Sequence, residues 1–441
     1  MDDATRDRIL HFIGDSIAPP PASNTRRVIR GPHSLPNKAT AVIGMRRAGK
    51  TTFLHQMRSE RIAAGIAAAQ LPYWNFEDER ISGLRAEQLH LLLSEYFRQH
   101  PDLRQRQTVT LCLDEIQVVP GWERFVRRLL DTEKVEIFLS GSSAAMLSRE
   151  VATSMRGRGW EVVVHPFSFA EALAHQGDAA LLAATAPTSR RRSLLEKRLI
   201  DYLAIGGFPE VQDVDDATRN RILLDYVDVV MLRDVVERHE ITGITALRWL
   251  VRHLLGNAGG SFSVQKFFDA LKSQGLRLAK DSLHDLVAHL NDCFLVRTVW
   301  LETESERRRM VNPRKIYPVD PAFIRRFDPA RRANVGHTLE AAVLIELERR
   351  GAAVTYVRTE AGHEVDFLAR FPDGAVQLIQ VAAAAVHERT VEREVRALAE
   401  AKPSFPGCTA HLVVLDHDGL PPSLPRGITA HAATEWMLGG D

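Results

Sequence analysis

The sequence has few cysteines, almost no net charge and no long apolar run. Its three cysteines, Cys112, Cys293 and Cys408, lie far apart and form no C-x-x-C pair. This argues against a disulfide framework and against a cysteine zinc site. The formal net charge is +1, so any surface that attracts nucleic acid or a membrane must be local.

Targeting signals are also missing from the sequence. Residues 1–30 carry acids and arginines without an apolar h-region, so we expect no signal peptide. No window approaches the roughly 18 uninterrupted apolar residues of a membrane span. These absences predict a cytoplasmic protein with no membrane partner. The 441 residues are enough for roughly two to four domains.

The segment 41–52, AVIGMRRAGKTT, joins a short apolar run to the spacing G-x-x-x-x-G-K-[ST]. A strand, a glycine-rich turn and a helix start are the context of a phosphate loop, whose backbone amides point at phosphate oxygens. Lys50 can reach the β- and γ-phosphates of ATP, and the Thr51 hydroxyl can ligate Mg²⁺. The alternative, a turn that binds nothing, is disfavoured by the flanking strand and helix. The predicted loop residues are Gly44, Arg46, Arg47, Ala48, Gly49, Lys50, Thr51 and Thr52.

The segment 108–117, TVTLCLDEIQ, is typical of a Walker B strand. Asp114 would hold the magnesium ion through water, and Glu115 would orient and polarise the attacking water. An adjacent catalytic glutamate indicates the ATP-hydrolysing branch of the P-loop class, which has an extra strand between the two Walker strands. We assign the predicted strand 71–76 to that place.

Three further side chains are candidates for the nucleotide site. Ser140 ends an apolar strand, where it could lie beside the γ-phosphate as a sensor residue or cap the next helix. Arg158, and less so Arg156, could act as an arginine finger on the transferred phosphoryl group, in cis or from a neighbouring subunit. Arg46 and Arg47 could contact phosphates or a neighbouring subunit, or could face solvent.

Apolar patterning predicts an α/β chain in several parts. From residue 39 to about 169, short apolar strands alternate with amphipathic helices, as in a parallel sheet with crossover helices. We expect strands at 39–43, 71–76, 109–113, 135–140 and 160–165, and helices at 50–65, 86–99, 121–131 and 143–150. The predicted parts are a lead-in (1–38), a P-loop ATPase domain (39–170), a helical segment (171–261), a winged-helix segment (262–330) and a small α/β domain (331–441).

The chain resembles the bacterial and archaeal AAA-type ATPases that join a P-loop domain to a C-terminal domain of unknown function. The motifs that carry the resemblance occur in order at 44–52, 113–117, 139–142, 157–158, 166–171, 202–210, 233–238, 315–320 and 364–367. The resemblance implies an ATPase with a winged-helix segment and a C-terminal fold like PD-(D/E)xK nucleases. It implies little about biological role.

A nuclease of that fold would gather carboxylates and a lysine around Mg²⁺. Glu340 on the predicted helix 338–350 and Asp366 match two of the expected acids. The strand 376–381 should carry Glu-x-Lys, but it reads Gln380-Val381-Ala382. We therefore predict no metal-dependent nuclease activity, unless displaced residues such as Glu364 or Glu388 take over.

Residues 262–318 read as two helices followed by two strands that are joined by the charged stretch 302–309. The second helix is only mildly basic, with Lys280, whereas the wing candidate at 307–309 is a run of three arginines suited to phosphates. Two functions follow as hypotheses: an ATP-gated protein that binds nucleic acid, with double-stranded DNA favoured, or an ATP-controlled scaffold that binds a protein partner. Either could act as a homo-oligomer.

Overall fold

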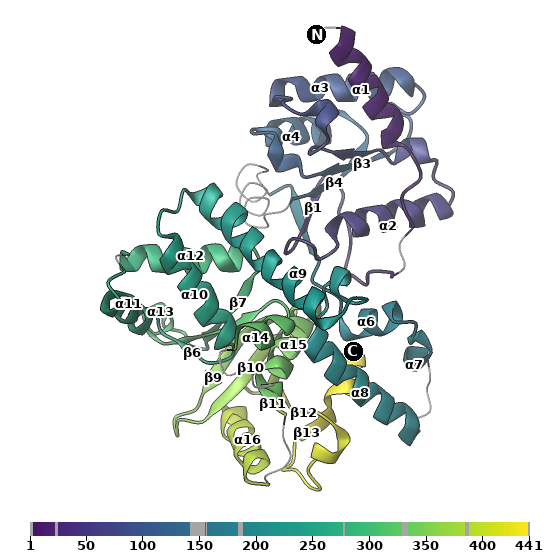
Figure 1. The fold of residues 1–441 in the computed structure, drawn as a ribbon. Coiled ribbons are helices and arrows are strands. Elements are labelled where there is room, and N and C mark those ends of the chain that lie inside the picture. Colours follow the sequence, from purple (N-terminus) through teal and green to yellow (C-terminus); the bar gives the residue numbers. More distant parts are fainter. Residues whose placement is uncertain are drawn as a thin grey trace. The chain divides into compact units, whose positions relative to one another are not determined.

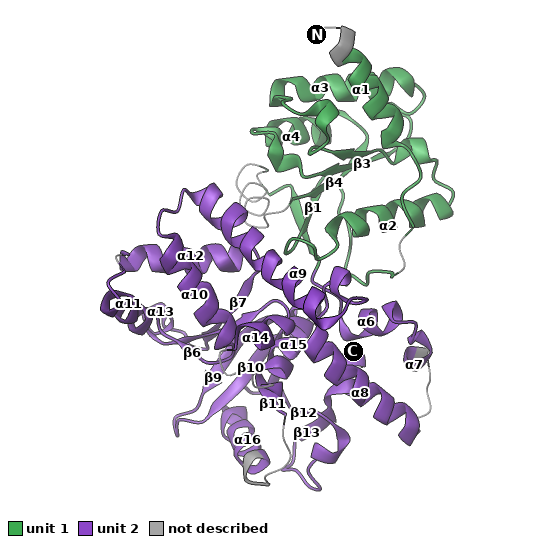
Figure 2. Ribbon diagram, viewed as in Figure 1, with its two compact units in different colours: residues 1–164 green, residues 165–441 purple. Residues whose placement is uncertain are grey.

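The computed structural model describes residues 3–22, 25–141, 155, 157–183, 188–276, 278–328, 334–383 and 388–439 of the chain (Figure 1). The chain divides into two compact units, Met1–Val164 and His165–Asp441 (Figure 2). The predicted helix at 143–150 and Arg156 lie outside the described residues.

Unit 1 is built on a five-stranded sheet in the order β2-β3-β4-β1-β5, and all four strand pairs are parallel. The strands are β1 (Ala39–Ile43), β2 (Tyr73–Asn75), β3 (Val109–Asp114), β4 (Val135–Ser140) and β5 (Gly159–Val163). Strands β1 and β3 are buried at every residue, as expected for a parallel sheet covered on both faces. The predicted parallel α/β fold of this part of the chain is confirmed.

Among the described residues of this unit, three helices connect successive strands and a fourth precedes β1. They are α1 (Asp3–Ser16), α2 (Lys50–Ala63), α3 (Leu89–Gln99) and α4 (Trp122–Thr132), with short 3-10 turns at Ala68–Gln70, Glu79–Ile81, Ala86–Gln88 and Ile116–Val118. Helix α2 buries Phe53, Leu54 and Met57 in one cluster with Val42 of β1 and Phe138 of β4. This packing fixes the start of α2 against the end of β1.

The strand order corrects one prediction. The strand between the two Walker strands β1 and β3 is β4, whereas β2 lies at the edge of the sheet beside β3. Strand 71–76 precedes the Walker B strand in the sequence, but its position in a parallel sheet is set by the path of the crossover helices. The sheet therefore has the extra strand of the ATP-hydrolysing branch, although a different segment provides it.

Unit 2 contains a mixed eight-stranded sheet in the order β13-β12-β11-β10-β9-β7-β8-β6. Its strands are β6 (Ser261–Phe262), β7 (Val296–Leu301), β8 (Arg314–Pro318), β9 (Ala353–Arg358), β10 (Glu364–Arg370), β11 (Val376–Ala382), β12 (Thr409–Val414) and β13 (Ile428–Ala432). Strand β7 pairs with β9 through Trp300 opposite Thr355. The predicted segments 262–330 and 331–441 thus share one sheet, and the boundary at 330 stays a prediction.

The helices of unit 2 flank this sheet. They are α6 (Phe169–His175), α7 (Ala179–Ala183), α8 (Ser189–Ile205), α9 (Asp216–Val229), which continues into a π-helical stretch (Val230–Glu237), α10 (Ile244–Gly256), α11 (Val264–Ser273), α12 (Lys280–Asp292), α13 (Glu306–Val311), α14 (Ala322–Phe327), α15 (Val335–Arg349), α16 (Glu388–Ala401) and α17 (Ala433–Leu438). The predicted helical character of the segment after the ATPase domain is confirmed.

The predicted wing is partly wrong. Strands β7 and β8 do form an antiparallel pair, but the arginines at 307–309 lie on helix α13 rather than in an extended loop. Ser305 caps this helix, since its hydroxyl accepts a hydrogen bond from the Arg308 amide at 3.3 Å. A serine followed by a glutamate favours a helix start, and this local preference overrides the loop.

Three of the sequence motifs meet around Asp320 inside unit 2. The Asp320 carboxylate accepts hydrogen bonds from the Gly207 amide at 2.6 Å and from the Ala322 amide at 2.9 Å. Gly206 has a φ of 84°, and a Cβ there would lie 2.1 Å from Asp320 Oδ1. The Phe167 amide donates to the Gly207 carbonyl at 2.5 Å. These motifs therefore build the frame of unit 2.

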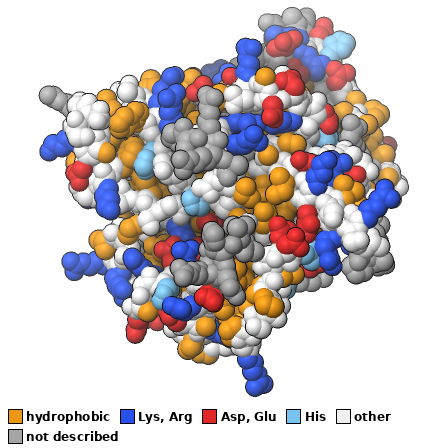
Figure 3. Space-filling view, turned by 60° about the horizontal axis from the view of Figure 1, so that its bottom comes forward, with side chains coloured by type: hydrophobic (Ala, Val, Ile, Leu, Met, Phe, Trp, Pro, Cys, Tyr) orange, Lys and Arg blue, Asp and Glu red, His pale blue; other side chains and the backbone are white. Residues whose placement is uncertain are grey.

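Charged side chains on the face shown in Figure 3 are interspersed, with Lys and Arg lying among acidic, neutral and hydrophobic side chains. This agrees with the net charge of +1. No helix among the described residues is both long and apolar enough to cross a membrane.

Candidate nucleotide site

The phosphate loop follows β1 directly. The chain turns through Gly44 (φ 144°), Arg47 (φ 65°) and Gly49 (φ 101°) before α2 begins at Lys50. A Cβ on Gly44 would lie 2.2 Å from the Val164 carbonyl oxygen, and the left-handed φ of Gly49 disfavours a side chain there as well. Both glycines of the motif are thus required by the backbone path.

An arginine outside the sequence motif, Arg27, supports the phosphate loop. Arg27 is 2% exposed, and its Nη1 donates to the Ala48 carbonyl at 2.5 Å. The Arg27 amide donates to Gln56 Oε1 at 2.6 Å, which ties the lead-in to α2. The segment predicted as a polar lead-in is therefore part of the support of the phosphate loop.

Lys50 lies buried at the first turn of α2. Its Nζ donates to the carbonyl oxygens of Gly44 and Met45 at 3.0 and 3.1 Å. An ammonium group and the free amides of a helix N-terminus at one loop attract anionic oxygens. The loop is suited to a polyphosphate, and Lys50 would exchange these carbonyls for phosphate oxygens.

Asp114 is the centre of a hydrogen-bonded cluster at the end of β3. Its Oδ2 accepts from Thr51 Oγ1 at 2.9 Å and from the Tyr73 hydroxyl, and its Oδ1 accepts from the Ser140 hydroxyl. Burial and the Asp114 charge raise the pKa of Tyr73, so this tyrosine remains a donor. A carboxylate beside a hydroxyl supplies the oxygen ligands that Mg²⁺ prefers.

Glu115 follows Asp114 with a left-handed φ of 55°. The side-chain Nε2 of Gln117 donates a hydrogen bond to Glu115 Oε2. Because β1, β3 and β4 are parallel neighbours, their carboxyl ends bring the loop, both acids and Ser140 to one edge of the sheet. The structure thus brings together the predicted residues 44–52, Asp114, Glu115 and Ser140.

For Ser140, the sequence allows either a sensor role beside the γ-phosphate or a helix cap. Its hydroxyl donates to Asp114 and its side chain is fully buried, so it belongs to the Asp114 cluster. The helix that it would cap lies outside the described residues.

Arg158 lies at the opposite end of the strands, where β1 and β5 begin. Its carbonyl accepts from the Ala39 amide at 2.8 Å, beside the first residue of β1. Strands β1 and β5 pair in parallel from Ala39 to Ile43, and at about 3.3 Å per residue this places Arg158 about 16 Å from the phosphate loop. Its guanidinium pairs with Asp131 of α4. The structure therefore does not bring Arg158 together with the other predicted site residues.

Tyr73 and Arg27 were missed by sequence reasoning. Tyr73 reaches Asp114 because β2 pairs with β3, with Tyr73 opposite Cys112. The apolar run 71–76 was visible in the sequence, yet only the strand order shows which acid its tyrosine meets.

A second polar cluster lies in unit 2, around Asp366. Lys315 of β8 donates to Asp366 Oδ1 at 3.0 Å and to Glu364 Oε1 at 2.8 Å. Gln380 Nε2 donates to Asp366 Oδ2 at 2.8 Å and to Glu394 Oε2 at 2.6 Å. The lysine that is missing from the strand 376–381 thus has a counterpart on β8, 51 residues before Asp366 in the chain. The side chain of Glu388 lies outside the described residues.

This cluster does not fit a metal ion. The Asp366 oxygens accept from Lys315, from Gln380 and from the Val381 amide, which leaves them engaged by N–H donors. Glu340 accepts from the Tyr317 hydroxyl at 3.0 Å, and burial together with the Asp366 charge raises its pKa. No group of three or more His, Cys, Asp or Glu side chains within the described ranges is arranged as a metal site.

Comparisons with known proteins agree with the geometry of unit 1. The family model of an AAA domain matches residues 36–173, and that of a domain of unknown function, DUF8612, matches residues 196–332. Uncharacterized protein MJ1544 of Methanocaldococcus jannaschii is 32% identical over 377 residues, which are 83% of this chain and 79% of that protein. The chain belongs to the MJ1544 family.

Two further proteins are similar to this chain. An uncharacterized protein of Haemophilus influenzae is 29% identical over 342 residues, covering 77% of this chain and 81% of its own. The Walker-type ATPase PABY2304 of Pyrococcus abyssi aligns over 73% of this chain and 95% of its own, with 17% identity and a TM-score of 0.38. That score is too low to carry an assignment. The AAA-type P-loop fold of this MJ1544 relative rests on the AAA domain match and the strand order of unit 1.

Proposed function

We propose that the protein is a Mg²⁺-dependent cytoplasmic ATPase whose nucleotide state controls its binding to nucleic acid. One observation carries the proposal: Lys50, Thr51, Asp114 and Glu115 converge at one sheet edge, and Thr51 Oγ1 lies 2.9 Å from Asp114 Oδ2. These are the groups that cradle phosphates, hold the metal and activate water in P-loop ATPases.

In the proposed reaction, the amides at the start of α2 and the Lys50 ammonium bind the phosphates of ATP. Thr51, and Asp114 through water, would hold Mg²⁺, which would supply positive charge to the phosphates of ATP. Glu115, positioned by Gln117, orients a water molecule and takes its proton. The water oxygen bonds to the γ-phosphorus as the bond to the bridging oxygen breaks, and ADP leaves with those electrons.

Arg158 would act on the nucleotide of a neighbouring subunit, which makes the active form a homo-oligomer. Its place at the far end of the strands supports a role in trans. Three arginines of α4 line a cavity of about 470 Å³ together with Arg158 and Asp131; they are Arg124, Arg127 and Arg128. This concentration of positive charge is suited to an anionic group from outside the subunit.

The nucleic-acid part of the proposal is supported by the element order in unit 2. Helix α10, β6, α11, α12, β7, α13 and β8 follow one another, and the sheet order is β7-β8-β6. Apart from the inserted α13, this order is the one expected for a winged helix. The C-terminal cluster around Asp366 would be an inactive nuclease-like site, because Lys315 and Gln380 engage its carboxylate oxygens.

The experiment that tests this function measures DNA binding and ATP hydrolysis together, at two salt concentrations, with ATP, ADP and no nucleotide. We expect affinity for DNA to depend on the nucleotide and to fall steeply with salt, because phosphate contacts release counterions. Hydrolysis with no binding to DNA or RNA in any state would contradict the nucleic-acid part. ATP-dependent assembly in its place would favour a scaffold that binds a protein partner, to which the exposed Val229 and Leu232 would be suited.

A further inference from the structure

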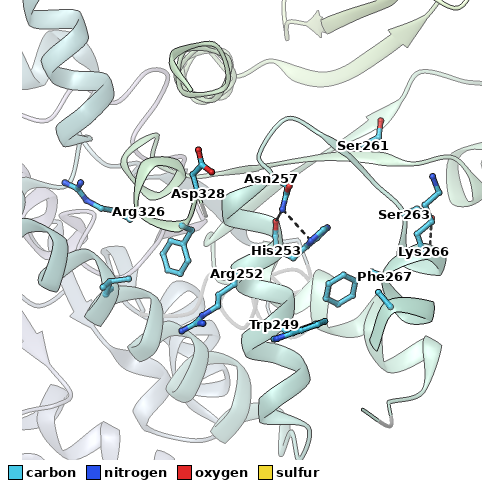
Figure 4. A pocket seen from close by; sticks show the side chains of 13 residues that line it. Trp249, Arg252, His253, Asn257, Ser261, Ser263, Lys266, Phe267, Arg326 and Asp328 are labelled. Carbon is cyan, nitrogen blue, oxygen red and sulfur yellow. Dashed lines mark hydrogen bonds between the residues drawn. The ribbon is translucent and has the colours of Figure 1, made fainter. Parts of the chain in front are cut away.

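A cleft of about 800 Å³ opens in unit 2 among α9, α10, α11 and α14 (Figure 4). Helix α10 contributes Trp249, Arg252 and His253, and helix α11 contributes Lys266 and Phe267. The cleft also includes the N-terminus of α11, where the Ser263 hydroxyl accepts from the Lys266 amide at 3.4 Å. It belongs neither to the nucleotide site nor to the Asp366 cluster.

The charge of the cleft is predominantly positive. Its lining holds Arg252, Lys266 and Arg326 against one acid, Asp328. Among the described residues, no ion-pair partner is found for Arg252 or Lys266, and both are exposed. The cleft is therefore suited to an anionic ligand.

Arg326 adds a buried cation to this lining. Its side chain is 9% exposed, and its Nε and Nη2 form no hydrogen bond within the described part of the chain. The carboxylate of Asp216 is 3.8 Å from Nη2. A buried guanidinium with unsatisfied donors is costly, and an anion in the cleft would reduce that cost.

Aromatic rings supply the other half of the site. Trp249 is 42% exposed on the same helix face as Arg252, three residues later. Phe267 and the half-buried Phe327 line the same cleft, and His253 contacts the Phe267 ring at 5.0 Å between centroids. An open indole beside cations is the combination that stacks a nucleobase and pairs its phosphate.

We infer that this cleft binds a single-stranded segment of nucleic acid, with one base stacked on Trp249 and an adjacent phosphate held by Arg252 and Lys266. The inference deepens the proposed function and rests on it, since it names the form of nucleic acid and the place where it binds. Bases in a duplex are stacked and paired inside the helix, so they cannot reach the Trp249 ring. Single-stranded DNA and RNA share the required chemistry.

The surface expected for a winged helix is less suitable. Helix α12 offers Lys280 as its only lysine or arginine. Helix α13 presents exposed Arg307 and Arg308, but it has no aromatic ring on which a base could stack. An acidic peptide would use the cations of the cleft but would gain little from the flat exposed face of Trp249. The cleft thus favours a ligand that is both anionic and flat.

The test measures fluorescence anisotropy of labelled oligo-dT and oligo-rU of about 12 nucleotides, and of a duplex of equal length, with the full chain. The variants are Trp249→Ala, Trp249→Phe and Arg252→Ala. Arg248→Ala is the matched control, because Arg248 is exposed on α10 but does not line the cleft. Thermal unfolding of each variant checks the fold, and an acidic peptide such as poly-glutamate serves as competitor.

We expect Trp249→Ala to weaken single-strand binding about 5- to 150-fold, Trp249→Phe to retain most of it, and Arg248→Ala to leave it nearly unchanged. Arg252→Ala should lower the salt slope by about one. A preference for dT or rU would assign the source as DNA or RNA. If affinity for the single strand changes with ATP, the result also supports the proposed control of binding by nucleotide. If it does not change, the control by nucleotide is refuted while the binding site in the cleft stands.

Three results would overturn the inference. Tight duplex binding that Trp249→Ala leaves intact would keep the proposed function but place it elsewhere. Equal displacement by poly-glutamate would assign the cleft to an acidic protein partner. Absence of binding to any nucleic acid, in every nucleotide state, would refute both the inference and the nucleic-acid part of the proposed function.

Discussion

Replacement of Lys315 by methionine should destabilise unit 2 strongly. The Lys315 ammonium lies 2.8 Å from Glu364 Oε1 and 3.0 Å from Asp366 Oδ1, and its side chain is 5% exposed. Burial lowers the pKa of Lys315, but the charges of Asp366 and Glu364 outweigh it, so the pKa stands above its ordinary value. The lysine is therefore charged in the folded protein at neutral pH, and its loss leaves a buried carboxylate without a counter-charge.

The size of the effect follows from this burial. Removing one partner of a buried ion pair costs about 3–5 kcal/mol. Asp366 would keep the hydrogen bonds from Gln380 Nε2 at 2.8 Å and from the Val381 amide at 3.1 Å, and methionine preserves most of the side-chain volume. We therefore expect a loss near the lower limit, about 3 kcal/mol, which for a unit of this size corresponds to a fall in the unfolding midpoint of about 5 °C.

Differential scanning calorimetry of the full chain at pH 7 measures this midpoint. Lys272→Met is the matched control, because Lys272 is exposed on α11, and its midpoint should stay within about 2 °C of wild type. The double variant Lys315→Met/Asp366→Asn should recover part of the loss, since it removes both charges. A midpoint of Lys315→Met as close to wild type as that of the control would refute the reasoning.

Three more predictions concern other parts of the chain. Tyr73→Phe removes a hydrogen bond to the Asp114 carboxylate and should lower kcat/KM for ATP about tenfold; steady-state kinetics at saturating Mg²⁺ check this. Arg158→Ala should bind ATP but not hydrolyse it, and mixing it with Lys50→Ala subunits should restore some turnover; no recovery would count against a finger in trans. Burial raises the pKa of Asp320 from 3.8 to about 6, so its contribution to stability is full below pH 3.8 and is lost as pH rises through 6, by about 3 kcal/mol. Urea unfolding of wild type should show this fall and Asp320→Asn should not; parallel pH curves would contradict it.

The parts of the fold that could be predicted are those with local signals. The apolar run before Gly44 and the acids that end β3 place the Walker strands from the sequence, because a strand and its terminal residues are adjacent in the chain. The start of α13 at Glu306 is also encoded locally, by the capping Ser305, although a run of arginines between two predicted strands favours a loop.

Other features depend on contacts that are distant in the sequence. Tyr73 meets Asp114 only because β2 pairs with β3. The strand between the two Walker strands is β4 because the crossover connections place it there. Lys315 joins Asp366 because β8 and β10 belong to one sheet, so a search for Glu-x-Lys on a single strand could not find it. In each case the sequence shows the residue itself, but the order of the strands in the sheet determines which side chain it contacts.

The most direct test of the account is ATP hydrolysis by the full chain and by Glu115→Gln, with binding of ATP measured in parallel. Glu123→Gln on α4 is the control, since Glu123 lies on the helix after the Walker B strand. We predict that Glu115→Gln binds ATP as wild type does and hydrolyses it at least about 100-fold more slowly, while the control keeps its activity. Wild-type turnover in Glu115→Gln would contradict the assignment of the catalytic site.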